Sequence, residues 1–169
     1  RGAGIYIDCD VYCVRPIRSR EYVIGYERDG ATNGAVLAMP SDCLLLTKLR
    51  HAAAGPGFIP PWLKPEKRII HKLGYLLGLG RSAHSMPWGT FGPHALTYYV
   101  KELGLQNEVC PQDVFYPLDH GRISLLFDPE LTIEDISTHR TECIHLYNEL
   151  LRRRGTENIP PTSPLGRML

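Results

Sequence analysis

The sequence has no excess of charge of either sign. Its 169 residues include 19 lysines and arginines against 18 aspartates and glutamates, which leaves a formal net charge of +1 at pH 7. Such a balance gives no field to hold a nucleic-acid backbone and no polybasic signal for a membrane surface. The sequence also lacks an apolar run near the roughly 20 residues that a membrane-spanning helix needs. We therefore expect no nucleic-acid partner and no transmembrane segment in this chain.

Paired cysteine motifs are absent as well. The cysteines are odd in number and widely spread, and none belongs to a C-x-x-C pair: Cys9, Cys13, Cys43, Cys110 and Cys143. A disulfide framework in a short secreted chain uses an even number of cysteines, and a zinc site shows tighter pairs. We interpret these residues as reduced thiols, most of them small and buried, which favours a reducing compartment.

The overall composition is that of an ordinary globular protein. Hydrophobic residues make up 43% and charged residues 22%, so a wholly disordered chain is excluded. The first residue is Arg1 rather than Met, and no leader-like pattern precedes the first strand-like segment. We expect one domain of ordinary size or part of a larger one, cut from a longer protein.

Strand-like and helix-like stretches alternate along residues 1–154, which predicts a mixed α/β domain. The predicted strands cover residues 4–7 (buried), 11–14, 22–26, 35–39 (a strand or a helix start), 108–110 and 114–116. The predicted helices cover residues 43–54, 66–77, 94–103 and 141–153. The tail, residues 155–169, has three prolines and no apolar periodicity. We expect it to be extended or disordered.

Two aspartates follow directly on the first strand candidate. On an extended chain residues i and i+2 point to the same side, so the carboxylates of Asp8 and Asp10 converge. Convergent carboxylates repel each other unless a cation lies between them. Oxygen ligands suit Mg²⁺ or Mn²⁺, and phosphate oxygens usually complete the coordination shell of such an ion. The position of the pair also fits the rule that open α/β sheets bind ligands beyond the carboxyl ends of their strands. The alternative is a solvated turn with two surface aspartates.

The segment that contains this pair resembles a known family. Residues 1–10, Arg-Gly-Ala-Gly-Ile-Tyr-Ile-Asp-Cys-Asp, are similar to the R-x-G-G-I/V-Y-L/I-D-x-D segment of family 32 glycosyltransferases, described as "sugar-binding region containing DXD motif". Later segments agree in order: 33–38 with N-x-x-M/L-A, 91–97 with T-G-P-x-x-L-T, and 144–148 with A/V-H-L/V-W-N. The resemblance covers about residues 1 to 153. The relatives include α-1,4-galactosyltransferases, α-mannosyltransferases and bacterial capsular polysaccharide enzymes.

The match departs from the family pattern at several points. Ala3 replaces the first glycine, Phe91 the usual threonine and Tyr147 the usual tryptophan. Phe91 and Tyr147 keep bulk or aromaticity but lose or change a polar group. The family has a GT-A-type α/β fold whose nucleotide-binding strands and helices precede the D-x-D, and this chain begins at the motif. The resemblance therefore implies an incomplete GT-A-type catalytic domain over residues 1–154.

The resemblance implies a metal-dependent, retaining glycosyltransferase that moves a sugar from a nucleotide-diphosphate donor to a saccharide or glycolipid acceptor. Asp10 is implied as a direct metal ligand, and Asp8 as a ligand through water or a partner of a ribose or sugar hydroxyl. His145, on the last predicted helix, is implied as a further ligand. A neutral imidazole favours Mn²⁺ over Mg²⁺. By itself, a histidine between Ile144 and Leu146 is more typical of a core or surface residue. No catalytic nucleophile or base is assigned.

The resemblance places further residues near the donor. Asn33 reaches the donor sugar from a loop, or is a plain turn residue. Gly92 and Pro93 bring helix N–H groups toward a phosphate or the acceptor, although helix initiation explains the same dipeptide. Asn148 lies three residues after His145 on the same predicted helical face, and hydrogen-bonds a phosphate.

Other functions fit parts of the sequence. Residues 5–10 also resemble the start of haloacid-dehalogenase-type phosphatases, in which the first aspartate is a nucleophile. That motif has Thr or Val where this chain has Tyr12, and the later Asp-Asp pair is missing from the sequence. A third possibility is a non-catalytic fragment that binds sugars or a partner. Bacterial family members work in the cytoplasm and eukaryotic ones in the Golgi lumen, and the cysteines favour the bacterial, cytoplasmic case.

Overall fold

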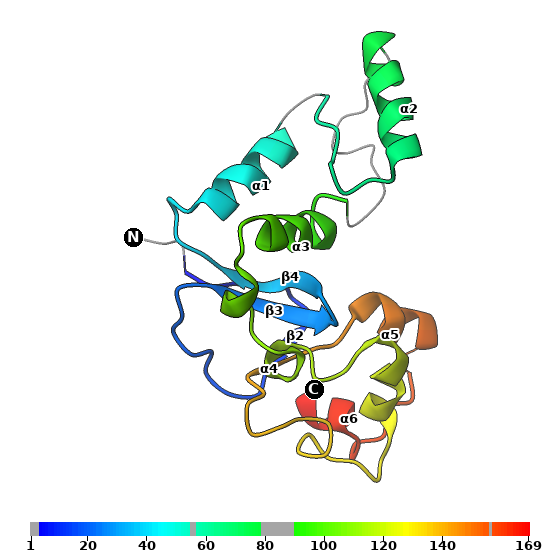
Figure 1. Cartoon of the computed structure of the whole chain (residues 1–169). Coiled ribbons are helices and arrows are strands. Elements are labelled where there is room, and N and C mark those ends of the chain that lie inside the picture. Colours follow the sequence, from blue (N-terminus) through cyan, green and yellow to red (C-terminus); the bar gives the residue numbers. More distant parts are fainter. Residues whose placement is uncertain (1–3, 55–56, 79–89, 156) are drawn as a thin grey trace.

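The fold is mixed α/β with two small antiparallel sheets, as the alternation of strand-like and helix-like stretches predicts (Figure 1). It is a computed structural model that describes residues 4–54, 57–78, 90–155 and 157–169. Within these ranges, every helix is too short or too polar to traverse a lipid bilayer.

The larger sheet is built around a hairpin. Its strand order is β1 (Tyr6–Ile7), β4 (Ala31–Ala38) and β3 (Val23–Arg28). A two-residue turn, Asp29-Gly30, joins β3 to β4, and the φ of +68° at Gly30 suits a glycine. This turn is much tighter than the loop that the polar stretch before residue 35 predicts. Asn33 therefore lies within a strand and not in a loop.

The first strand is exposed, although its apolar run predicts a buried one. β1 pairs only with β4, with Tyr6 opposite Leu37 and Ile7 opposite Val36. Among the described residues no strand pairs with its other edge, and the Tyr6 side chain is 59% exposed. An apolar, β-branched run indicates a strand, but the neighbours of that strand determine whether it is buried.

The smaller sheet joins distant parts of the chain. β2 (Val11–Cys13) pairs with β5 (Cys143–His145), so that Val11 lies opposite His145. The predicted helix over 141–153 is wrong in its first half, because residues 143–145 form β5 and the helix α5 (Asn148–Arg154) begins only afterwards. Tyr147, with a left-handed φ of 51°, makes the corner between them. Pairing with β2 has overridden the helical apolar spacing of this segment.

Helices α1 (Leu44–Ala54), α2 (Pro65–Leu76) and α3 (Pro93–Glu102) confirm the helices predicted there, with shifts of one residue at most boundaries. α3 covers one face of the larger sheet (Figure 1), where Leu96 and Val100 pack in one cluster with Ile24 of β3 and Leu45 of α1. α2 projects away from this body and has no buried residue.

The segment after α3 is helical where two strands are predicted. It contains the 3-10 helix η2 (Gln106–Glu108), the short helix α4 (Gln112–Phe115) and the 3-10 helix η3 (His120–Phe127). Pro111 stands at the N-cap of α4, next to the position at which proline favours helix initiation. Only Cys110 makes a strand-like contact, an isolated parallel bridge to Gly25. A Cβ on Gly25 would lie 2.7 Å from the Phe115 ring, so this close approach requires glycine.

The C-terminal tail is not extended throughout. It ends in a short helix, α6 (Pro164–Met168), whose N-cap Ser163 accepts a hydrogen bond from the Gly166 N–H at 3.2 Å. Leu165 is buried in the same cluster as Leu118 of the chain's second half. The expectation of an extended or disordered tail is wrong for this helix, because a helix of one turn is too short to show apolar periodicity.

Candidate metal centre

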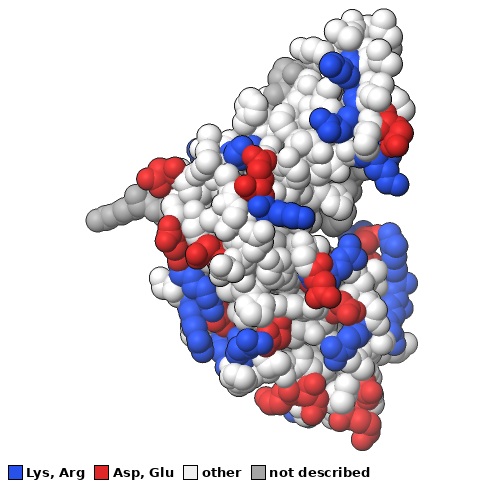
Figure 2. Space-filling model, viewed as in Figure 1, with Lys and Arg blue, Asp and Glu red and all other residues white. Residues whose placement is uncertain are grey.

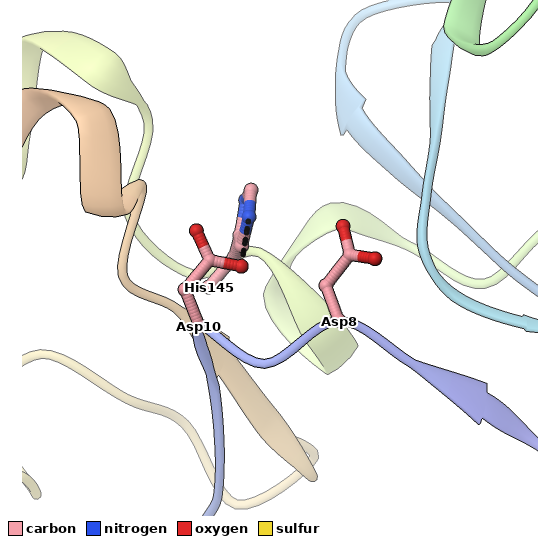
Figure 3. Close-up of side chains that lie close together, drawn as sticks. All are labelled: Asp8, Asp10 and His145. Atoms are coloured by element: carbon pink, nitrogen blue, oxygen red, sulfur yellow. Dashed lines mark ion pairs between the residues drawn. The ribbon is translucent and has the colours of Figure 1, made fainter.

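Three side chains from opposite ends of the chain meet where the chain passes from one sheet to the other (Figure 3). Asp8 follows β1, Asp10 precedes β2, and His145 is the last residue of β5. Each offers one potential ligand atom, and these atoms all lie within 4.8 Å of one another. They are the three residues that the sequence resemblance implies as metal ligands. We call them the triad.

Backbone hydrogen bonds attach the two aspartates to different sheets. The Asp8 N–H donates to the Ala35 carbonyl of β4, and the Asp10 carbonyl accepts from the Leu146 N–H, both at 2.8 Å. The Asp8 carbonyl accepts from the Val11 N–H at 3.2 Å, which closes a turn between the two carboxylates. The i, i+2 spacing predicts that the carboxylates converge along one extended strand. In the structure they converge across this turn instead.

The Asp10 carboxylate is oriented by groups on the distant end of the chain. Its Oδ2 accepts a hydrogen bond from the backbone N–H of Asn148, the first residue of α5, at 2.9 Å. Its Oδ1 lies 3.4 Å from Nε2 of His145. A carboxylate with two such partners has little rotational freedom, so its position is set before any ligand binds.

The Asp8 carboxylate has a hydrogen-bond partner on the preceding strand, β1. Its Oδ1 accepts a short hydrogen bond from the Tyr6 hydroxyl, and this bond, with the charge of Asp8, raises the pKa of Tyr6. Tyr6 was not among the predicted site residues. The alternation of side chains along a strand is the signal that finds it, because residues 6 and 8 point to the same side.

His145 is the most buried member of the triad, with a side chain only 10% exposed. Burial lowers its pKa, although nearby carboxylates, of which Asp10 contributes most, act in the opposite direction. A lowered pKa favours the neutral imidazole, which is the form that binds a metal ion. Among the described residues the buried Nδ1 atom has no hydrogen-bond partner. The protein thus leaves one ring nitrogen of this histidine unsatisfied.

Two tyrosines form an aromatic wall around the imidazole. The ring centroid of Tyr147 lies 4.1 Å from that of His145, and the ring centroid of Tyr116 lies 5.9 Å from it. Burial raises the pKa of both hydroxyls, so neither side chain ionises near neutral pH. The Tyr116 hydroxyl donates to the Asn33 carbonyl at 3.3 Å and accepts from the Val36 N–H at 3.2 Å. These rings are packing elements that fix the imidazole.

A third acidic side chain lies next to Tyr147. Glu27 of β3 is largely buried, and its Oε1 is 3.6 Å from Nε2 of the exposed His120. The His120 ring packs on Tyr147 with centroids 4.5 Å apart. After burial, the charge of Glu27 is the largest cause of the raised pKa of Tyr147. Sequence reasoning missed both residues, because only the tertiary fold brings them to Tyr147.

Two of the predicted donor-binding residues border the triad. Asn33 lies in β4, where its Oδ1 accepts from the Ala35 N–H at 2.9 Å, and the Ala35 carbonyl in turn holds Asp8. Asn148 is exposed at the start of α5, with its N–H on Asp10. Asn148 does not share a helical face with His145, because β5 ends and α5 begins between them. Their contact with a donor stays a prediction.

Gly92 lies in another part of the molecule. It is exposed at the N-cap of α3, and its neighbour Phe91 packs against Phe58 and Trp62 with centroids 6.2 and 6.4 Å apart. No contact in the described part of the chain joins Gly92 to the triad. The helix start by itself accounts for this glycine-proline pair.

The cysteines lie outside the triad, and their burial is mixed. Cys110 and Cys143 are buried, but Cys9 and Cys13 are exposed, so the expectation that most are buried is wrong. All five are free thiols.

Comparison with known proteins gives no relative. No family model and no curated protein matches the sequence, and no solved structure matches the fold. The function is therefore inferred from the triad and from the sequence segments described above.

Proposed function

We propose that this chain belongs to a metal-dependent, retaining glycosyltransferase that moves a sugar from a nucleoside-diphosphate donor to a saccharide or glycolipid acceptor. The observation that carries the proposal is the convergence of Asp8, Asp10 and His145 from opposite ends of the chain. The resemblance to family 32 glycosyltransferases implies the same three residues as ligands. Local chain geometry cannot produce this agreement for His145, because β5 reaches the aspartates only through its pairing with β2.

The triad fits a divalent cation of the size of Mg²⁺ or Mn²⁺. Ligand atoms lie roughly 2.1 Å from such an ion, so ligands on opposite sides are about 4.2 Å apart. Atoms within 4.8 Å of one another therefore reach one ion after movements of about half an ångström. The imidazole of His145 in the triad favours Mn²⁺ over Mg²⁺, because imidazole suits the softer ion.

Each triad residue has a distinct role in this proposal. Asp10 is the central ligand, because its carboxylate is already oriented by the Asn148 N–H. Asp8 contacts the ion through water or binds a hydroxyl of the donor, with Tyr6 holding its carboxylate. His145 binds as a neutral imidazole against its aromatic wall. When bound, the cation stabilises the negative charge that grows on the leaving diphosphate.

The fold is consistent with part of a GT-A-type domain. The outer edge of β1 is unpaired among the described residues, and Ile5, Tyr6 and Ile7 are exposed there. An exposed apolar edge of this kind is suited to pairing with further strands. We place the activity in the cytoplasm, since free thiols are typical of a reducing compartment.

Turnover of nucleotide-sugars tests the proposal. The chain is incubated with Mn²⁺ and a panel of nucleotide-sugars, and release of the nucleoside diphosphate is measured. Asp10→Asn is expected to lower the rate at least about 100-fold, the usual cost of losing one group that stabilises the developing charge. Asp29→Asn is the matched control, because Asp29 is exposed in the β3–β4 turn and the same change there leaves the triad intact.

Two results would contradict the proposal. One is equal turnover by wild type and Asp10→Asn. The other is hydrolysis of p-nitrophenyl phosphate without any nucleotide-sugar turnover, which would favour the phosphatase alternative.

A further inference from the structure

Helix α2 carries an apolar face that nothing in the described structure covers. Apolar residues of the helix and its C-cap residue, Leu77, recur at helical spacing and form one stripe, with 55% to 74% of each residue exposed: Ile69, Ile70, Leu73, Leu76 and Leu77. The other exposed large hydrophobic residues of the described chain are Tyr75, on α2 outside the stripe, and five residues elsewhere: Ile5, Tyr6, Ile7, Leu44 and Leu169. An apolar stripe of this size on a projecting helix marks an interaction surface.

The remainder of the helix, together with its N-cap residue Lys64, is basic. Lys64, Lys67, Arg68 and Lys72 stand against a single acidic residue, Glu66, and Figure 2 shows the Lys and Arg atoms around the projecting end of the molecule. The whole chain has a net charge of only +1, so this segment is far more basic than the remainder. The balanced total charge predicts no polybasic signal, because a sum over the whole chain does not show that basic residues are concentrated at α2.

The basic and apolar side chains adjoin in one groove. Ile59 and Pro65 line it together with Arg68, Ile69 and Lys72 of α2. Arg68 and Lys72 are spaced i, i+4 and therefore lie on one side of the helix, next to Ile69 of the apolar stripe. Cations whose stems lie along apolar surface are typical of helices at the boundary between lipid headgroups and acyl chains.

We propose that α2 binds the surface of an anionic phospholipid bilayer. The apolar stripe enters the acyl-chain boundary, while the lysines and Arg68 contact lipid phosphates. Charge complementarity selects this partner, since four cations near one anion match an anionic surface. A second copy of the chain is disfavoured at the same face, because two α2 helices would bring their cations together. The triad takes no part in this binding, so the two proposals are independent.

Vesicle flotation tests the proposal with the full chain. Vesicles of phosphatidylcholine with 30% phosphatidylglycerol are compared with pure phosphatidylcholine. We expect binding to the anionic vesicles only, weakening as salt is raised. Each cation near such a surface strengthens binding about fivefold, so Lys67→Glu/Lys72→Glu is expected to weaken it at least about 25-fold. Arg50→Glu/Lys101→Glu makes the same charge change at exposed sites outside α2 and is expected to keep most of the binding.

The apolar stripe is tested separately. Leu73→Glu/Leu76→Glu is expected to lower vesicle binding at least about tenfold, because it removes two of the inserted side chains. Leu44→Glu is the control, since Leu44 is equally exposed on α1. Circular dichroism checks that each variant is folded. A Leu76→Trp variant adds a positive readout, a blue shift of its emission on anionic vesicles that Leu44→Trp does not show.

Three results would overturn this inference. The first is equal binding of wild type to both vesicle types, and the second is equal loss of binding in the α2 variants and their controls. The third is a wild-type dimer in analytical ultracentrifugation that Leu73→Glu/Leu76→Glu dissociates, with no vesicle binding, since the occupant would then be a second copy. Asp10→Asn is expected to leave vesicle binding unchanged.

Discussion

Two acidic sites lie at opposite ends of the strand β5, and their carboxylates have different partners. Glu142, just before the strand, is 1% exposed and receives two hydrogen bonds from the Arg20 guanidinium, one of them at 2.9 Å, and a third from the Arg18 N–H at 3.2 Å. At the other end of the strand, the aspartates of the triad have only His145 as an ion-pair partner among the described residues.

We interpret this difference as one between a structural charge and the proposed cation site. A buried carboxylate is stable only when its charge is compensated, and Arg20 compensates that of Glu142. The triad brings two carboxylates together without a lysine or arginine from the described chain. We infer that the compensating cation of the triad comes from outside the protein. The predictions below test this contrast.

The largest effect on stability is expected at Arg20. Arg20→Met keeps an apolar stem but leaves the buried Glu142 carboxylate without its main partner, and should cost about 3 kcal/mol of unfolding free energy. Asp10→Asn should change stability by less than about 0.5 kcal/mol, because the amide oxygen still accepts from Asn148 and the repulsion from Asp8 falls. Urea unfolding of both variants measures this. A larger loss in Asp10→Asn than in Arg20→Met would reverse the contrast.

Addition of a divalent cation should stabilise the wild type against unfolding but should leave the stability of Asp10→Asn almost unchanged. At a Mn²⁺ concentration 100 times the dissociation constant, binding to the native state contributes about 2.7 kcal/mol. Arg20→Met should gain the same increment, because it leaves the triad intact, whereas Asp10→Asn should gain little. Thermal unfolding with and without Mn²⁺ is the measurement. An equal gain in Asp10→Asn would place the ion elsewhere.

His145 is expected to determine the choice of metal. His145→Ala should weaken Mn²⁺ binding about tenfold, or 1.4 kcal/mol, and weaken Mg²⁺ binding less, because the imidazole suits the softer ion. Competition between the two ions, followed by Mn²⁺ electron paramagnetic resonance, gives the ratio. An equal loss for both ions would show that His145 is not a ligand.

A smaller, pH-dependent effect is expected at Glu142. Burial raises the pKa of this carboxyl, but the hydrogen bonds from Arg20 and Arg18 outweigh burial and leave it below its usual value of 4.5. Because the folded pKa is lowered, the contribution to stability is complete above 4.5 and is lost as pH falls through the folded value. Urea unfolding between pH 7 and pH 3 should therefore decline less steeply in Glu142→Gln. The same slope in both proteins would contradict the lowered pKa.

The sequence predicted the members of the triad but not their supports. Asp8 and Asp10 form a local motif, and the three long helices appear in apolar periodicity, so both are visible in one stretch of chain. The strand character of His145 depends on pairing between β2 and β5, which no local pattern contains. Short apolar segments fit a strand or a helix equally, and the fold decides between them.

The sequence also did not show that β1 and α2 are exposed. The apolar run in β1 predicts a buried strand, and the apolar residues of α2 predict a helix, yet both segments are exposed, since burial depends on what packs against a segment. Glu27 and His120 approach the triad only through the tertiary fold, so their place beside Tyr147 has no signature in the sequence.

The most direct test of the account is calorimetric titration of the chain with Mn²⁺ in the presence of a nucleoside diphosphate. The account predicts one site in the wild type and in Arg20→Met, and at least a tenfold weaker site, or about 1.4 kcal/mol, in Asp10→Asn. Asp29→Asn should bind as the wild type does. No Mn²⁺ binding by the wild type, or equal binding by Asp10→Asn, would contradict the claim that the triad holds a cation.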